Sequence, residues 1–182
     1  MTDKNVSIMN IGSMGYLPQV FKKIENEKKL NIVYLGGSIT MGCNATKTEL
    51  RYVDRSAKWW QTNFPDAEIS YFNAGIGATT SQFGVARVQE HVLDKQPDLV
   101  FVEFSVNDSS SPLFMETYES LVRRLLKAES VKAVVLINNL FYDTGTNAQG
   151  IHNAIGLHYD LPIVSVRNYI FPEIQLGNVC LA

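Results

Sequence analysis

Five short apolar runs alternate along the chain with segments in which apolar residues recur every three or four positions. The apolar runs are residues 32–35, 69–72, 99–104, 133–137 and 162–166. Runs of this length, bounded by glycine, proline or polar residues, are typical of strands buried on both faces of a parallel sheet. The pattern therefore predicts five strands.

The segments between these runs have the spacing of helices. The first expected helix begins at Pro18, and the second ends before Pro65. The third carries Val85, Val88 and Val92 on one face, and two more cover residues 115–128 and 148–159. Helices that alternate with parallel strands cover both faces of the sheet, and right-handed crossovers then favour a three-layer α/β/α sandwich. The helix before Pro65 contains Trp59 and Trp60, which we expect to be buried against the sheet; stacking on a sugar is the alternative.

The sequence has no internal repeat, linker or low-complexity tract. We therefore predict a single domain over residues 1–182, in which residues 1–29 form a helical lead-in to the first strand. Residues 43–54 are polar and are expected to form a loop.

Composition and charge exclude some classes of function. The chain has 182 residues, of which 46% are hydrophobic and 19% charged, and its net charge of −2 provides no basic surface for nucleic acid. No apolar run approaches the roughly 20 residues that span a bilayer, and no secretory signal precedes the first helix. As written, we expect a cytoplasmic protein, or a secreted one from which a leader has been removed. Cys43 and Cys180 match no metal or redox spacing, so free thiols are expected, and no cofactor is implied.

Small and polar residues follow the first three strands. Ser38 comes after Gly36-Gly37, Gly75 ends the second strand, and Asn107 follows the third. These exits share one edge of a parallel sheet, which is where ligands bind in such folds. A serine hydroxyl attacks an ester carbonyl when a base accepts its proton, and the backbone N–H groups of Ser38 and Gly75 with the Asn107 amide would bind the oxyanion.

Each of these residues also has a purely structural interpretation. Ser38 would cap the next helix, Gly75 would serve a turn, and Asn107 would form an Asx-turn. Coincidence at three successive strand ends favours the catalytic interpretation.

The same residues resemble the conserved blocks of a known family, the SGNH or GDSL-type hydrolases. Gly36-Gly37-Ser38-Ile39-Thr40 resembles block I, which carries the nucleophile. Asn73-Ala74-Gly75 resembles block II, with its oxyanion glycine, and Ser105-Val106-Asn107-Asp108 resembles block III, with its oxyanion asparagine. Flanking residues are similar to those of bacterial members with esterase activity.

This resemblance implies a flavodoxin-like parallel five-stranded sheet with the order 2-1-3-4-5. It also implies serine-dependent hydrolysis of small or carbohydrate-linked esters, for example deacetylation, with Ser38 as nucleophile and Gly75 and Asn107 in the oxyanion hole. The implied partner is a small-molecule or carbohydrate ester, with no nucleic acid and no membrane.

Three departures from the family pattern stand out. Gly37 replaces the block I aspartate, Ser105 replaces the block III glycine, and the Asp-x-x-His block that carries the general base is missing from the 182 residues. His91, His152 and His158 are poor substitutes, because a base must come within hydrogen-bonding distance of Ser38 Oγ.

Two explanations of the missing block are open. Either these residues are a fragment whose continuation supplies the aspartate and histidine, which we favour, or the chain is a degenerate member without a base. A fragment would lack its final helix and expose apolar sheet surface, so self-association is expected.

Three other functions stay open. The chain is alternatively a non-catalytic carbohydrate- or ligand-binding module, an acyltransferase, or a flavodoxin-like nucleotide binder. Against the last, the glycines lack the Gly-x-Gly-x-x-Gly spacing.

Overall fold

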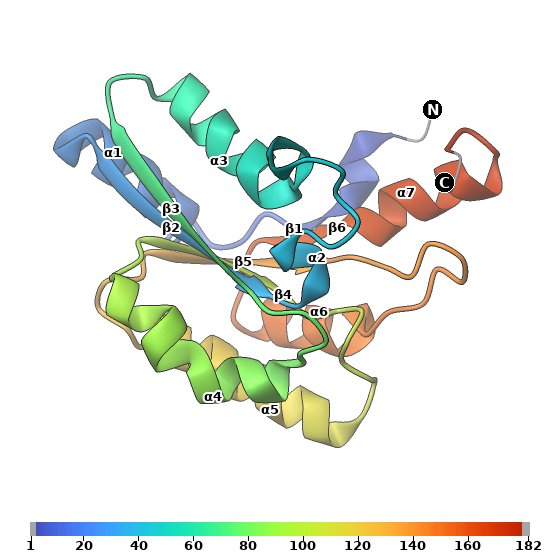
Figure 1. Ribbon diagram of the computed structural model, residues 1–182. Helices are drawn as coiled ribbons and strands as arrows, with labels where there is room; N and C mark the ends of the chain where they lie inside the picture. Colours follow the sequence, from blue (N-terminus) through green and yellow to red (C-terminus); the bar gives the residue numbers. More distant parts are fainter. Residues whose placement is uncertain (1–2, 180–182) are drawn as a thin grey trace.

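A six-stranded sheet runs through the middle of the protein in the computed structural model, which describes residues 3–179 (Figure 1). Its spatial order is β1-β6-β5-β4-β2-β3. The strands are β1 (Ile8–Asn10), β2 (Lys29–Gly36), β3 (Glu68–Gly75), β4 (Leu99–Glu103), β5 (Ala133–Asn138) and β6 (Ile163–Ser165). Strands β2 to β6 are mutually parallel and correspond to the five predicted runs, so the predicted order 2-1-3-4-5 is confirmed.

The prediction of five strands was wrong by one. β1 pairs antiparallel with β6 at the edge of the sheet, inside the segment that was expected to be a helical lead-in. It has only three residues, and Ile8 is 50% exposed, so no alternation of buried and exposed positions marks it in the sequence. The remainder of that segment contains a 3-10 turn (Lys4–Ser7) and the predicted helix α1 (Leu17–Glu27), with Pro18 in its first turn.

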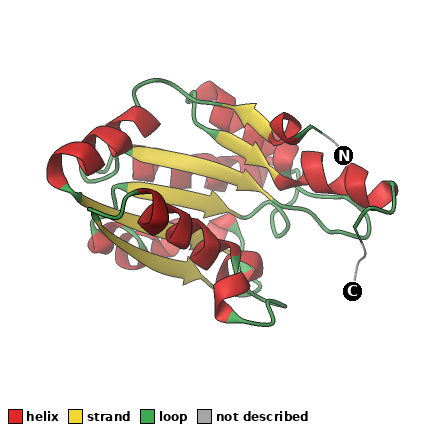
Figure 2. Ribbon diagram, turned by 90° about the horizontal axis from the view of Figure 1, so that it is seen from above, coloured by secondary structure: helices red, strands yellow, loops and turns green. Residues whose placement is uncertain are grey.

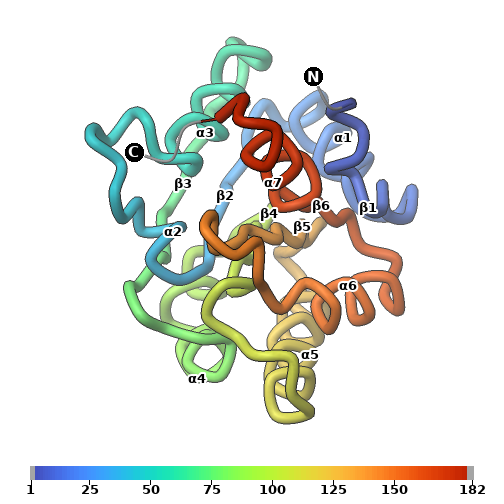
Figure 3. Tube along the Cα trace, turned by 90° about the vertical axis from the view of Figure 1, so that its right-hand side faces the viewer, coloured from blue at the N-terminus to red at the C-terminus, as the bar shows by residue number. Residues whose placement is uncertain are grey.

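Helices cover both faces of the sheet, as Figure 1 and the end-on view of Figure 3 show. α1 and α3 (Tyr52–Asn63) pack on one face. α4 (Ser81–His91), α5 (Pro112–Leu126) and α6 (Gln149–His158) pack on the other. Short 3-10 turns lie at Thr48–Leu50 and Leu93–Lys95. The layered arrangement confirms the predicted α/β/α sandwich, and Figure 2 shows the strands enclosed between helices.

Alternate residues of each strand supply the two cores. On β2, Val33 and Leu35 face α4 and α5, whereas Ile32 and Tyr34 face α1 and α3, and all four are fully buried. Because both faces of the strand are covered, both sets of alternate positions are apolar, and the strand has a continuous apolar run.

The residues after β6 form a helix that the sequence pattern did not predict. α7 (Val166–Gln175) starts directly after the strand, and Ser165 Oγ caps it by accepting a hydrogen bond from Asn168 N at 3.1 Å. Pro172 lies inside this helix, and proline ordinarily indicates a helix end. The predicted fifth strand is correspondingly shorter and ends at Ser165.

The two adjacent tryptophans differ in burial. Trp60 is 5% exposed and packs with Phe21 and Phe64, as expected, whereas Trp59 is 52% exposed, so the expectation of burial was wrong for Trp59. Within residues 3–179, no helix has the length and apolar character needed to cross a membrane.

Candidate active site

Three neighbouring strands end at the same level at the carboxyl edge of the sheet. Gly36, the last residue of β2, is in register with Gly75 of β3 and with Glu103 of β4, and β2 lies between the other two strands. The loops after β2 and β4 carry Ser38 and Asn107. The structure therefore places Ser38, Gly75 and Asn107 at the ends of three adjacent strands, while their catalytic roles stay a prediction.

Ser38 is the first residue of α2 (Ser38–Met41), a single helical turn that follows Gly36-Gly37. The turn packs so closely on the sheet that a Cβ added to Gly36 would stand 2.0 Å from Thr40 Oγ1 and 2.5 Å from Glu103 O. Glycine is therefore required at position 36. The half-buried side chain of Ser38 starts this turn at the strand exit.

Hydrogen bonds on two sides hold the turn in place. Asn73 Nδ2 donates to Thr40 O at 2.8 Å and links α2 to β3. On the other side, Thr40 Oγ1 lies 2.8 Å from the hydroxyl of Tyr52 in α3. A nucleophile position needs this kind of support, because small misplacements of reacting groups reduce rates strongly.

Gly75 is required by close packing rather than by a positive φ. A Cβ at this position would stand 2.2 Å from Met41 N and 2.6 Å from the carbonyl carbon of Thr40. Its N–H donates to Asn73 Oδ1 at 2.9 Å. This N–H is the predicted oxyanion donor, so a bound oxyanion would share it with Asn73 or replace that bond.

Asn107 lies against the backbone that leads to Ser38. A Cβ added to Gly37 would stand 2.8 Å from Asn107 Oδ1. That oxygen is buried and has no hydrogen-bond partner among the described residues. The amide oxygen therefore lies beside the nucleophile turn, and Nδ2 of the same amide is the atom that would donate to an oxyanion.

Asp108, the residue after Asn107, forms a buried pair with His152. His152 Nε2 lies 3.0 Å from Asp108 Oδ2, both side chains are fully buried, and Asp108 Oδ1 accepts from Ser81 N at 2.9 Å. The imidazole stacks on Tyr118 with ring centroids 3.6 Å apart. Burial lowers the pKa of His152 below its usual value, against the opposing effect of the Asp108 carboxylate. This histidine is a core residue that joins α6 to the block III loop.

The other two histidines lie at helix ends. His91 is the last residue of α4, and its Nδ1 is 3.2 Å from Arg87 Nη1. His158 is the exposed last residue of α6 and contacts the ring of Tyr159. In the described part of the chain, neither histidine forms a hydrogen bond or ion pair with Ser38 or its turn.

Glu103 is a polar residue of this region that sequence reasoning missed. Its carboxyl is fully buried, Oε1 accepts from Ser105 N and Oγ at 3.2 and 3.1 Å, and Oε2 has no partner among the described residues. Burial raises the pKa of Glu103 to about 7. A single acidic residue inside the apolar run 99–104 is the signal that marks it in the sequence.

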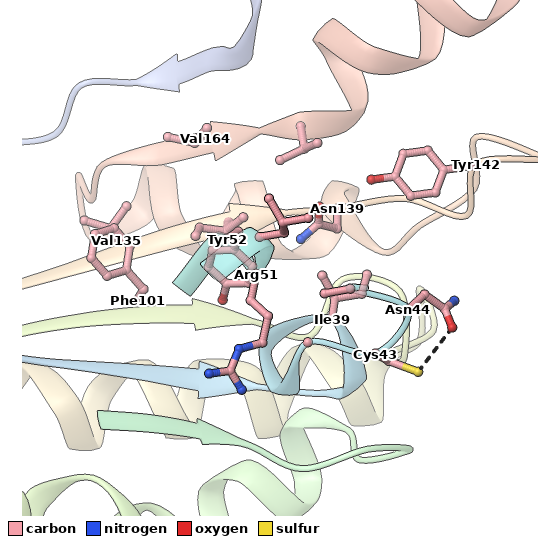
Figure 4. Close-up of a pocket in the computed structure, with 15 residues that line it drawn as sticks. Ile39, Cys43, Asn44, Arg51, Tyr52, Phe101, Val135, Asn139, Tyr142 and Val164 are labelled. Atoms are coloured by element: carbon pink, nitrogen blue, oxygen red, sulfur yellow. Dashed lines mark hydrogen bonds between the residues drawn. The ribbon is translucent and has the colours of Figure 1, made fainter. Parts of the chain in front are cut away.

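A cavity of about 460 Å³ opens beside the nucleophile turn (Figure 4). Ile39, the residue after Ser38, lines it together with Tyr52, Asn139 and Tyr142. Its walls come from residues 42–52 and from the loop after β5. Phe101, Val135 and Val164 form its sheet side and also line a second, largely apolar groove of about 410 Å³ beside α1 and Trp59.

Residues 3–179 contain no group of three or more histidine, cysteine, aspartate or glutamate side chains able to hold a metal ion. Cys43 is exposed and free. Cys180, the other predicted free thiol, lies outside the described residues.

The fold is a mostly parallel sheet covered by helices on both faces, with Ser38 at the exit of β2. Residues 34–163 match the model of the GDSL-like lipase/acylhydrolase family. The chain belongs to this family, which confirms the resemblance seen in the sequence blocks. The search of curated proteins found no match.

Two solved esterase structures share this fold. A two-domain esterase (CEX) active on acetylated mannans, co-crystallized with mannopentaose, has a TM-score of 0.95 and 46% identity over 98% of this chain and 49% of its own. This chain therefore spans about half the length of CEX. A catalytic mutant of Axe2, an acetylxylan esterase from Geobacillus stearothermophilus, has a TM-score of 0.67 and 18% identity over 80% of each chain, and at that identity shows the fold alone.

Proposed function

We propose that this chain carries the nucleophile and oxyanion hole of a serine esterase that deacetylates carbohydrates or other small esters. The observation that carries the proposal is the convergence of Ser38, Gly75 and Asn107 on one helical turn at the ends of β2, β3 and β4. The 46% identity to an esterase active on acetylated mannans supports an acetylated polysaccharide or oligosaccharide as the substrate class.

The reaction would proceed in two acyl transfers. Ser38 Oγ attacks the acetyl carbonyl while a base accepts the hydroxyl proton, and the carbonyl oxygen becomes an oxyanion. The N–H groups of Ser38 and Gly75 and the Asn107 amide would stabilise that charge, each donor being worth about 10²–10³ in rate. When the intermediate collapses, the bond between the acetyl carbon and the sugar oxygen breaks, and that oxygen takes the proton from the base and leaves as a free hydroxyl. Water then attacks the acetyl-serine and releases acetate.

The general base is the incomplete part of this mechanism. His152 is fully buried against Asp108, and His91 and His158 stand at helix ends. Family resemblance assigns the base to an Asp-x-x-His block, which the 182 residues do not contain. We therefore propose that full activity depends on such a block beyond them.

The test is hydrolysis of acetylated manno-oligosaccharides, followed by acetate release, with the chain as given and with a version extended into the downstream reading frame. We expect Ser38→Ala to lower the activity of the competent form by at least about 1,000-fold. Ser109→Ala is the matched control, since Ser109 is an exposed serine at the same edge. An extended chain that carries Asp-x-x-His and remains inactive would contradict the proposal.

A second candidate is a carbohydrate-binding module without turnover, which the position of the three histidines favours. It predicts that manno-oligosaccharide binding, measured by calorimetry, survives Ser38→Ala unchanged and that no acetate is released by either form. Acyl transfer to a second alcohol is a variant of the first candidate. It predicts an acetylated acceptor in place of free acetate.

A further inference from the structure

Arg87 is a buried arginine whose guanidinium bridges two strand ends of the candidate active site. The residue lies on α4 and is 6% exposed. Its Nη2 donates to Gly36 O at 3.0 Å, and its Nη1 donates to Ala74 O at 2.7 Å. These carbonyls belong to the ends of β2 and β3, immediately before the residues that enter the candidate site.

Among residues 3–179, no carboxylate forms an ion pair with this guanidinium. The ion pairs recorded within residues 3–179 do not include Arg87, and its Nε is buried there without a hydrogen-bond partner. Burial lowers the pKa of Arg87 to about 10. Burying a cation without an opposite charge is unfavourable. The guanidinium is therefore stabilised by the two strand-end carbonyls, with His91 Nδ1 3.2 Å from Nη1 and the Phe83 ring centroid 5.8 Å from Cζ.

One of these carbonyls is directly coupled to a predicted oxyanion donor. Ala74 O and Gly75 N–H belong to the same peptide group, so donation from Arg87 to the oxygen draws electron density through the amide. An N–H of a peptide polarised in this way is a stronger donor, because successive hydrogen bonds reinforce one another. The other carbonyl, Gly36 O, also accepts from Ile76 N at 3.1 Å, which locks β3 to β2 just beyond Gly75.

We propose that Arg87 is a positioning residue of the candidate oxyanion hole: its guanidinium holds the ends of β2 and β3 together and polarises the Ala74–Gly75 peptide toward a developing oxyanion. The proposal rests on the proposed esterase function. Arg87 acts through the backbone and does not itself contact the substrate.

The test compares Arg87→Gln and Arg87→Lys with Arg124→Gln. Arg124 is a matched control, because this exposed arginine of α5 also donates to a backbone carbonyl, Val85 O at 2.9 Å, away from the strand ends. The first measurement is amide hydrogen exchange on the full chain without substrate. We expect Arg87→Gln to speed exchange at Gly75 and Ile76 at least about tenfold, Arg87→Lys to have a smaller effect, and Arg124→Gln to change neither amide.

The second measurement is ester hydrolysis by the competent form. A residue that acts on the transition state lowers kcat with little change in KM, so we expect Arg87→Gln to reduce kcat about tenfold or more and to change KM less than about twofold. Partial recovery of kcat in Arg87→Lys would support the polarising charge. A merely structural role would instead lower the melting temperature and the active fraction without this split.

The two arms separate the two proposals. If the extended wild-type chain, with its Asp-x-x-His block, hydrolyses no ester but Arg87→Gln speeds exchange at Gly75 and Ile76, the proposed function fails and the bridging role of Arg87 stands. If Ser38→Ala abolishes activity while Arg87→Gln retains wild-type kcat and exchange, the esterase stands and the role of Arg87 is refuted. Where Arg87→Gln does not fold, Arg87→Lys decides the outcome by the same two measurements.

Discussion

The backbone of Gly37 lies directly against the side-chain amide of Asn107, so that a Cβ at position 37 would stand 2.8 Å from Asn107 Oδ1. The two residues enter from adjacent strands, β2 and β4. This contact gives a physical reason for the glycine in place of the block I aspartate. A larger side chain at position 37 would displace the amide that the candidate oxyanion hole needs.

Gly37→Ala should therefore reduce activity by displacing Asn107. We expect kcat/KM to fall about tenfold or more, because a displaced oxyanion donor loses part of the 10²–10³ that such a donor contributes. Asn107→Ala should lose the whole of that factor. In the double variant the two losses should not add, since residues that act through one contact are coupled. Additive losses in kcat/KM would show that Gly37 acts independently of Asn107.

Gly75→Ala should displace the nucleophile turn. Its Cβ would meet backbone atoms of Thr40 and Met41, which cannot move without moving α2. We expect loss of activity and a reduction in unfolding free energy of about 1–3 kcal/mol, the usual cost of overpacking. The control is Gly77→Ala, whose Cβ would meet only the flexible end of the Met41 side chain at 3.4 Å. Equal effects of the two substitutions in urea unfolding and ester hydrolysis would contradict this explanation.

Glu103 should make stability fall as pH rises. Burial raises its pKa from 4.5 to about 7, so between these values the folded state holds more protons than the unfolded state. The neutral carboxyl is favoured at low pH, and its contribution to stability is lost as pH rises through about 7. The full difference in unfolding free energy is about 3 kcal/mol.

Glu103→Gln isolates this effect, because the amide retains the shape and carries no charge. As pH rises from 4.5 to 8, the unfolding free energy of the variant should increase relative to that of wild type. The measurement is urea unfolding of both proteins across that range. A constant difference between them would show that Glu103 has the same pKa folded and unfolded.

Asp108→Ala should destabilise the fold strongly. The substitution leaves Ser81 N–H and the His152 imidazole buried without their acceptor, and each buried group left without a partner costs about 1–3 kcal/mol. Asp94→Ala removes an exposed aspartate that accepts only from Gln89, and should change unfolding free energy by less than about 0.5 kcal/mol. Similar denaturant midpoints for the two variants would contradict a structural role of the Asp108–His152 pair.

Much of this architecture was predictable because it rests on local patterns. Strands β2, β4 and β5 are marked by apolar runs, since the interior of a parallel sheet is covered on both faces. β3 lies at the edge of the sheet and leaves Tyr71 and Phe72 exposed. β1 was not predicted because an edge strand of three residues is too short to show a periodic pattern of apolar residues. α7 was not predicted, and the Pro172 inside it is a residue that ordinarily indicates a helix end.

The sequence by itself determined the doubly covered parallel sheet and the position of Ser38, Gly75 and Asn107 at its carboxyl edge. Helices between successive strands make the strands parallel, and the residue at each strand exit can be read from the local sequence. Only the tertiary structure decided that Arg87 bridges the ends of β2 and β3, and that His152 pairs with Asp108. Those partners are 51 residues (Arg87 to Gly36) and 44 residues (Asp108 to His152) apart. Such contacts depend on the packing of helices against the sheet, which no local pattern of residues specifies.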